Sequence, residues 1–129
     1  MIATAAPLRV LFIEDEAALQ LSYRRYFGRR YEVASAETGA EAMRQLAACR
    51  PEVAVLDMRL PDTDGIDLLR RLRAERPELP IVITTAYLSV EPQLRVLNLS
   101  YHGYIVKPFD LDELGRAIEH AGSAVAARR

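Results

Sequence analysis

The sequence contains few of the features that mark secreted, membrane-spanning or nucleic-acid-binding proteins. Its one cysteine, Cys49, can form no intramolecular disulfide, which indicates a reducing, cytoplasmic setting and predicts a buried thiol on a helix. The apolar runs at 10–13 and 53–56 are far too short to cross a bilayer, and no cationic stretch with a long apolar core opens the chain. There are 17 basic and 18 acidic residues, so no basic field exists for a phosphate backbone. We therefore expect neither a membrane span nor direct nucleic-acid binding.

At 129 residues, half of them apolar, the chain is predicted to fold as one compact domain with a single core. Residues 1–7 are expected to form a loose leader, residues 8–122 the folded domain, and residues 123–129 a helix end or the start of a linker. The sequence leaves open whether residue 129 is a natural end or precedes another domain.

Short apolar runs alternate with helical patterns along the chain. Strands are predicted at residues 8–13, 31–34, 52–56, 80–84 and 103–106. Helices are predicted at residues 16–27, from 38 to the stop at Pro51, from 64 onward, at 89–99, and from 110 onward. This alternation favours an α/β fold with a parallel sheet and helices on both faces. In such a sheet the carboxyl ends of the strands hold the functional site.

Capping residues and side-chain spacing predict how the helices start and which faces they bury. Thr38, Asp64 and Asp110 are placed to cap the second, third and fifth helices. The residues expected to point inward are Leu19, Tyr23 and Phe27; Ala40, Met43, Leu46 and Ala47; Ile66, Leu69 and Leu72; and Leu111, Leu114 and Ile118. The helix at 89–99 has no clean apolar stripe.

Acidic side chains stand at the ends of two predicted strands. Glu14 and Asp15 follow the first strand, and Asp57 follows the run 53–56, where a carboxylate contributes nothing to packing. Three carboxylates at one edge repel each other unless a cation or proton enters. Oxygen ligands without paired His or Cys favour Mg²⁺, or Mn²⁺, over zinc. The alternative is that residues 14–16 form only the solvated entrance to the first helix.

Two threonines stand at the end of the fourth predicted strand, and a lysine follows the fifth. Lys107 precedes Pro108, whose preceding peptide bond can be cis, and Thr84 and Thr85 alternate to opposite faces. Taken alone, Lys107 is typical of a snorkelling surface residue, and either threonine of a backbone cap. Together with a metal and carboxylates, these groups are the equipment for holding a transferred phosphoryl group, with one carboxylate as nucleophile.

Four segments together resemble the receiver domain of two-component response regulators. They are residues 10–16 (VLFIEDE), 56–65 (LDMRLPDTDG), 84–86 (TTA) and 104–109 (YIVKPF). Their order and separations suit that family over nearly the whole chain, from Leu8 to about Gly122. The resemblance implies a flavodoxin-like doubly wound sheet of five parallel strands, in the order 2-1-3-4-5, with five helices on both faces.

The resemblance also implies the chemistry of the polar residues. Asp57 would accept a phosphoryl group from a phosphohistidine and form an acyl phosphate, and Lys107 would pair with the phosphate. Asp15 and Asp57 would ligate Mg²⁺ directly, and Glu14 would act through water. The backbone carbonyl of Arg59 would complete the protein ligands. No enzymatic activity is expected beyond this phosphoryl transfer and its slow reversal by hydrolysis.

A phosphorylation-dependent switch follows from the same resemblance. Thr85, which precedes the small Ala86, matches the switch hydroxyl, and Tyr104 matches the aromatic side chain that turns inward. The Lys107–Pro108 bond would be cis. Phosphorylation would remodel the surface of the fourth helix, fifth strand and fifth helix. The implied partners are a sensor histidine kinase or phosphotransfer protein and a downstream output domain or protein, and homodimers are common in the family.

Several positions depart from the commonest family pattern. Glu14 stands where aspartate is frequent, and Ser100 and Tyr101 stand where glycine and alanine usually end the fourth helix. Pro92 falls in the first turns of that helix. The fourth helix is therefore expected to be shortened, shifted or mobile.

Two large side chains suggest how long the acyl phosphate lasts. Arg59 and Tyr87 each stand two residues after a site residue, Asp57 and Thr85. They are large enough to crowd the attacking water, which predicts slow self-dephosphorylation. The alternative is that both are ordinary exposed side chains.

Three other classes of protein compete with this interpretation. A phosphatase of the haloacid-dehalogenase type needs a second acid two residues after its nucleophile, where this chain has Arg59. A flavin or nucleotide module needs a glycine- or hydroxyl-rich loop after the first strand, where residues 14–16 are all acidic. A receiver-like binding module that works without phosphorylation stays open because of the altered fourth helix.

Overall fold

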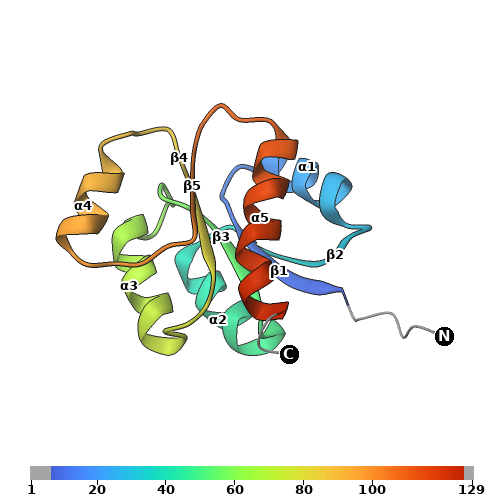
Figure 1. Ribbon diagram of the computed structural model, residues 1–129, viewed down its shortest axis with the longest axis horizontal. Helices are drawn as coiled ribbons and strands as arrows, with labels where there is room; N and C mark the ends of the chain where they lie inside the picture. The colour runs from blue at the N-terminus through green and yellow to red at the C-terminus, as the bar shows by residue number, and fades with distance from the viewer. Residues whose placement is uncertain (1–6, 127–129) are drawn as a thin grey trace.

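A five-stranded parallel sheet lies between two layers of helices in the computed structural model, which describes residues 7–126 (Figure 1). The strands are β1 Leu8–Ile13, β2 Tyr31–Ala36, β3 Val53–Asp57, β4 Ile81–Thr85 and β5 Gly103–Val106. The helices are α1 Ala17–Phe27, α2 Gly39–Cys49, α3 Gly65–Glu75, α4 Val90–Val96 and α5 Leu111–Ala126. The order β2-β1-β3-β4-β5, with all neighbours parallel, confirms the predicted flavodoxin-like fold.

Side chains along each strand alternate between the two faces of the sheet and so create two apolar layers. One layer contains Leu11 and Ile13 of β1 and is covered by α2, α3 and α4. The other contains Val10 and Phe12 and is covered by α1 and α5, which lie beside each other in Figure 1. β3 and β4 are buried at every position because both of their faces are covered, which explains their continuous apolar sequences.

Strands β3 and β4 each end one residue later than the sequence predicted. Asp57 pairs with Thr84, and Thr85 pairs with Val106, so backbone pairing continues into the polar residues. Asp57 and Thr85 are therefore part of the sheet, and its backbone hydrogen bonds fix the main chain from which their side chains project. The edge strand β2 also extends two residues beyond the predicted end, to Ala36.

The three predicted helix caps are present. Side-chain oxygens of Thr38, Asp64 and Asp110 accept hydrogen bonds of 3.1, 2.7 and 2.8 Å from backbone N–H groups in the first turns of α2, α3 and α5. Each cap satisfies a donor that has no partner within its own helix.

The predicted buried face of α2 was partly wrong. Ala40 and Ala47 are exposed, Ala42 is buried in their place, and Leu46 is buried as expected. Small alanine side chains give a weak periodic signal, so the spacing alone could not orient the helix. Cys49, expected to be buried, is half-buried at the last position of α2.

α4 is shorter than the predicted helix at 89–99. It ends at Val96 because Asn98 adopts a left-handed conformation with φ of 55°, which asparagine tolerates better than most residues. The N–H of Leu99 then turns back to the carbonyl of Leu94 at 3.0 Å. Pro92 lies in the first turn, where its missing N–H breaks no helical hydrogen bond. The predicted shortening is therefore confirmed.

Within residues 7–126, no helix combines the length and apolar character needed to span a bilayer. Residues 1–6 of the predicted leader and residues 127–129 of the predicted closing segment lie outside the described range. Residues 123–126 continue α5 as helix. The proposed boundaries at 7 and 122 remain predictions.

Candidate phosphoryl-transfer site

The polar ends of β1, β3, β4 and β5 meet at the carboxyl edge of the sheet. Strand order reverses beside β1 at this edge, which is where open α/β sheets bind their ligands. A hollow of about 310 Å³ opens there. Its lining residues are Glu14, Asp15, Glu16, Asp57, Arg59, Leu60, Pro61, Thr85, Ala86, Tyr87 and Lys107. All predicted site residues except Tyr104 and Pro108 are among them.

A larger hollow, of about 730 Å³, is lined by residues from the start of β1 and the ends of α2 and α3. Arginines dominate its polar lining, but they are engaged with the backbone. Arg9 Nε donates to the carbonyl of Arg50 at 3.0 Å, and Arg76 Nη2 donates to that of Pro51 at 3.0 Å. These arginines hold the α2–β3 connection, whereas the groups suited to chemistry line the smaller hollow.

Three carboxylates gather at the ends of β1 and β3. The ligand oxygens of Glu14, Asp15 and Asp57 all lie within 4.8 Å of one another. Glu14 is 1% exposed and Asp57 is 4% exposed, while Asp15 is exposed at the hollow. Hard oxygen donors at this spacing fit Mg²⁺ or Mn²⁺, and none of the three offers the nitrogen or sulfur that zinc prefers.

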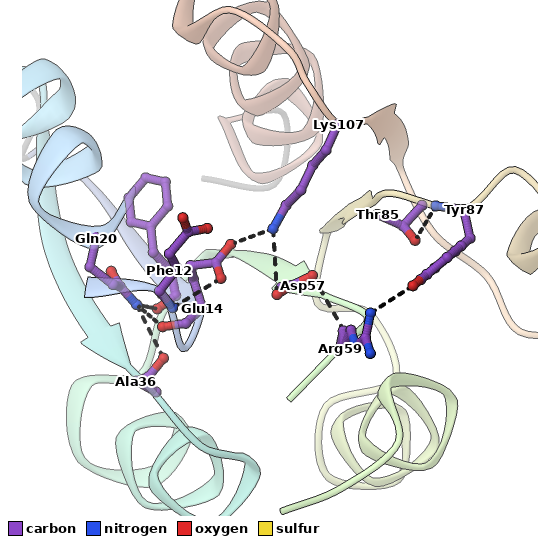
Figure 2. A network of polar contacts seen from close by, with 10 residues as sticks. Phe12, Glu14, Gln20, Ala36, Asp57, Arg59, Thr85, Tyr87 and Lys107 are labelled. Atoms are coloured by element: carbon purple, nitrogen blue, oxygen red, sulfur yellow. Dashed lines mark hydrogen bonds and ion pairs between the residues drawn. The ribbon is translucent and has the colours of Figure 1, made fainter. Parts of the chain in front are cut away.

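Lys107 bridges two of these carboxylates, as Figure 2 shows. Its Nζ donates to Glu14 Oε1 at 2.9 Å and lies 3.5 Å from Asp57 Oδ2. Burial alone would lower the pKa of Lys107, but the hydrogen bond to Glu14 and the charge of Asp57 outweigh it and raise the pKa. The ammonium therefore stays charged inside the cluster. The Lys107–Pro108 peptide bond is cis, as expected.

Burial opposes ionisation of the Glu14 carboxyl group. Burial raises its pKa to about 7, against the hydrogen bond from Lys107 and with help from the charge of Asp57. The backbone N–H of Glu16 also donates to Glu14 Oε2 at 3.2 Å. A carboxyl group whose ionised form is disfavoured by burial is stabilised by binding either a proton or a cation, which agrees with a cation site.

Tyr87 connects the residues on the other side of the hollow (Figure 2). Its backbone N–H donates to Thr85 Oγ1 at 3.1 Å, and its carbonyl accepts from the hydroxyl of Tyr104 at 2.7 Å. Its own hydroxyl lies 2.6 Å from Arg59 Nη1, whose guanidinium also packs over the Tyr87 ring. Tyr104, half-buried, thus reaches the site through Tyr87. Thr84 lies outside the hollow lining, with a buried hydroxyl that lacks a partner among the described residues.

The loop between β3 and α3 is held close to Asp57. The N–H of Arg59 lies 3.3 Å from Asp57 Oδ1. Gly65 packs so tightly on Met58 that an added Cβ would come within 2.5 Å of the Met58 Cα, so only glycine fits there. Asp62 accepts hydrogen bonds from the first two amides of α2, at 2.7 and 3.1 Å, and these bonds lower its pKa.

Sequence reasoning missed two residues that support this site. Asp62 joins the loop after Asp57 to the start of α2, a contact between segments far apart in the chain. Gln20 is buried in α1 and donates to backbone carbonyls at the end of β1. Its spacing of three and seven residues from the buried Tyr23 and Phe27 was the available signal, since it places Gln20 on the inward face.

Comparison with known proteins agrees with this geometry. The family described as "Response regulator receiver domain" matches residues 10–119. The response regulator MprA from Mycolicibacterium vanbaalenii is 38% identical over 109 residues, which cover 84% of this chain and 47% of MprA. The chain thus spans about half the length of this relative.

Solved receiver structures superpose on nearly the whole chain. A CheY-like receiver domain protein from Methanospirillum hungatei gives a TM-score of 0.87 at 26% identity, covering 96% of this chain and all of that one (100%). The regulator TrrA from Thermotoga maritima, solved in complex with Mg²⁺ and BeF, gives 0.77 at 25% identity, covering 88% of this chain and 98% of TrrA. The chain belongs to the receiver domain family of two-component response regulators, whose known role is that of a phosphorylation-dependent signalling switch.

Proposed function

We propose that Asp57 is the phosphoryl acceptor of this receiver domain. A carboxylate oxygen of Asp57 attacks the phosphorus of a phosphohistidine, the P–N bond breaks, and the imidazole leaves with the electron pair. The observation that carries this proposal is the position of Asp57. It is 4% exposed at the end of a central strand, 3.5 Å from the ammonium of Lys107 and beside the carboxylates of Glu14 and Asp15.

We propose that the acidic cluster holds Mg²⁺, with Mn²⁺ as a substitute. Asp15 and Asp57 would ligate the ion directly, Glu14 would act through water, and the backbone carbonyl of Arg59 would complete the protein ligands. When bound, the ion neutralises charge on the transferred phosphoryl oxygens. The all-oxygen donor set supports this assignment, as does the similarity to TrrA, whose structure contains Mg²⁺ and BeF.

Lys107 and Thr85 complete the chemistry on the protein side. Lys107 exchanges part of its present pairing with Glu14 and Asp57 for the phosphate oxygens of the acyl phosphate. The Thr85 hydroxyl, which lines the same hollow, donates a hydrogen bond to the phosphate. The domain needs no further catalytic group for this single transfer, and hydrolysis of the acyl phosphate resets it.

The proposed switch runs from Thr85 to Tyr104. Movement of Thr85 toward the phosphate, into space left by the small Ala86, breaks its contact with the Tyr87 N–H. Tyr104 then leaves the Tyr87 carbonyl and turns inward, which changes the surface made by α4, β5 and α5.

The proposed partners follow from this role. In the cytoplasm, where this chain is proposed to act, a sensor histidine kinase or phosphotransfer protein supplies the phosphoryl group. The α4, β5 and α5 surface acts on an output domain or protein, or on a second copy of the chain. The folded receiver unit is proposed to be residues 8–122, which contains the family match at 10–119.

Labelling with a small phosphoryl donor tests the acceptor. The chain is incubated with acetyl phosphate and Mg²⁺, and intact mass is recorded for the wild type and for Asp57→Ala. One phosphoryl group is expected on the wild type and none on the variant. A receiver-like module that works without phosphorylation gives no added mass on either protein, and equal labelling of both proteins would place the acceptor elsewhere.

A further inference from the structure

Gln20 is a polar side chain in an otherwise apolar layer between α1 and the sheet. It is 4% exposed, and its neighbours on the inward face of α1 are Tyr23 and Phe27. Its Nε2 lies 2.9 Å from the carbonyl oxygen of Phe12, 3.0 Å from that of Glu14 and 3.1 Å from that of Ala36 (Figure 2). A buried amide nitrogen among three carbonyl oxygens is a specific arrangement, because core positions of helices are usually apolar.

The orientation of the Gln20 amide follows from chemistry. The end that faces the three carbonyls must be the NH₂ group, because an amide oxygen there would meet three acceptors and no donor. Its two N–H groups serve three oxygens, so one hydrogen is shared between two of them. The Oε1 atom at the other end is buried without a partner among the described residues. The side chain is therefore held by the bonds that its nitrogen makes.

These bonds lie where the strand ladder runs out. β2 ends at Ala36, whose partner in the register is Ile13, and the N–H of Glu14 makes the next backbone bond to the Ala36 carbonyl at 2.9 Å. Beyond that point β2 offers no further residue to pair with Glu14. The Gln20 amide takes the place of the missing strand neighbour and satisfies the Glu14 carbonyl.

We propose that Gln20 is a positioning residue for the cation site. By fixing the backbone at Glu14, it sets the direction in which the Glu14 carboxylate leaves the strand, toward Lys107 Nζ at 2.9 Å and into the cluster with Asp57. The proposal rests on the Mg²⁺ site proposed above. Gln20 contacts no phosphate and no ion; it acts through the main chain of Glu14, as outer-shell groups act on metal ligands.

The test measures Mg²⁺ binding by isothermal titration calorimetry on the unphosphorylated 129-residue chain. Gln20→Met keeps the length of the side chain and removes its donors. We expect its Mg²⁺ dissociation constant to rise about tenfold or more, the range found when outer-shell partners of metal ligands are removed. Gln45→Met is the matched control, since it makes the same replacement on the half-buried face of α2, away from the cluster, and should leave the constant unchanged.

A second control separates positioning from general stability. Leu46→Ala removes a buried side chain of α2, which covers the opposite face of the sheet from α1, and lowers unfolding stability. Its folded form should bind Mg²⁺ as the wild type does. Where Gln20→Met does not fold, Gln20→Asn takes its place, because it keeps the donors but is too short to reach all three carbonyls, and the same weakening is expected.

The outcomes distinguish this inference from the proposed function. Unchanged Mg²⁺ affinity in the folded Gln20 variant, with a normal wild type, overturns the role of Gln20 and leaves the acceptor and cation site standing. Equal weakening in Leu46→Ala also overturns it, since the effect would then be general. A wild type that binds no Mg²⁺ overturns both proposals.

Discussion

The β3–α3 and β4–α4 segments perform the same task on one face of the sheet but are built very differently. Each carries a site residue at the end of a central strand, Asp57 or Thr85, and then turns into a helix. α3 has 11 residues, an N-cap bond from Asp64, and three leucines buried against the sheet. α4 has 7 residues, no side-chain cap bond, and one buried side chain, that of Leu94.

The exposed apolar surface follows the same division. Leu88 is 73% exposed and Val96 is 84% exposed, both in or beside α4. Few buried contacts mean a low free energy of local opening, so we expect α4 to shift more readily than α3. On the proposed switch, α4 would move in response to Thr85 while α3 keeps the loop after Asp57 in place.

Core truncation tests this comparison with the largest expected effect. Leu72→Ala in α3 empties a fully buried position and should lower the free energy of unfolding by about 2 to 5 kcal/mol. Val96→Ala in α4 should change it by less than about 0.5 kcal/mol, because the side chain is already in solvent. Urea unfolding of both variants provides the measurement. Similar losses would mean that α4 is anchored as firmly as α3.

Titration sharpens the contrast between the charged side of the hollow, where Glu14 follows β1 and lies beside Asp57 of β3, and the uncharged end of β4. The pKa of Glu14 lies near 7 in the folded chain and at 4.5 unperturbed, so ionisation opposes folding. This penalty is absent below pH 4.5, grows as pH rises, and is complete above pH 7. In Mg²⁺-free buffer, Glu14→Gln should therefore gain stability over the wild type across this window, by at most about 3.5 kcal/mol.

The control for this pH series is Thr85→Ala, which removes no charge. Its stability difference from the wild type should be the same at pH 5 and pH 8. Urea unfolding at several pH values checks both variants. A Glu14→Gln difference that stays flat with pH would contradict the raised pKa, and saturating Mg²⁺ should reduce the difference by stabilising the ionised cluster.

Removal of the helix caps gives a smaller effect of the same kind. Asp64→Ala deletes the side-chain bond to the first turn of α3 and should destabilise the chain by about 1 kcal/mol. Ser89→Ala at the start of α4 should be close to neutral, because Ser89 makes no side-chain cap bond. Thermal unfolding followed by circular dichroism distinguishes them. A larger loss for Ser89→Ala would reverse the proposed order of anchoring.

The smallest expected effect concerns the contact that joins the two segments. Arg59 and Tyr87 meet over the hollow at 2.6 Å, which supports the hypothesis that they crowd the attacking water. Replacing both by alanine should speed loss of the acyl phosphate several-fold, followed as the decay of the phosphorylated mass after the donor is removed. The control is Tyr26→Ala, which changes an exposed side chain of α1. An unchanged decay rate would mean that these side chains do not shield the phosphate.

The sequence could predict the site because several apolar strand sequences end in charged residues, which a buried strand does not need for packing. Asp57 and Lys107 each end an apolar run, and parallel strands bring such ends together, so convergence followed from the fold class alone. The bounds of α4 were harder to predict, since they depend on the left-handed conformation of Asn98 and on weak packing. Sequence spacing gave no clean stripe to define them.

Contacts between distant segments were beyond sequence reasoning for a different reason. Asp62 stood in a turn-rich loop where aspartate is ordinary, and only the folded chain places it against the start of α2. The spacing of Gln20 placed it on the inward face of α1, but the sequence could not predict which backbone carbonyls its side chain would bind. Both depend on three-dimensional placement of unpaired backbone amides and carbonyls.

The bonds from Asp62 to the amides of Gly39 and Ala40 give α2 a role although it contributes no side chain to the hollow. They connect the loop after Asp57 to a helix that packs on β1 and on the edge strand β2. A macromolecule bound at the beginning of α2 would displace the loop that follows Asp57, the proposed phosphoryl acceptor. On that proposal, such binding would change the lifetime of the acyl phosphate from a surface that does not contact the phosphate.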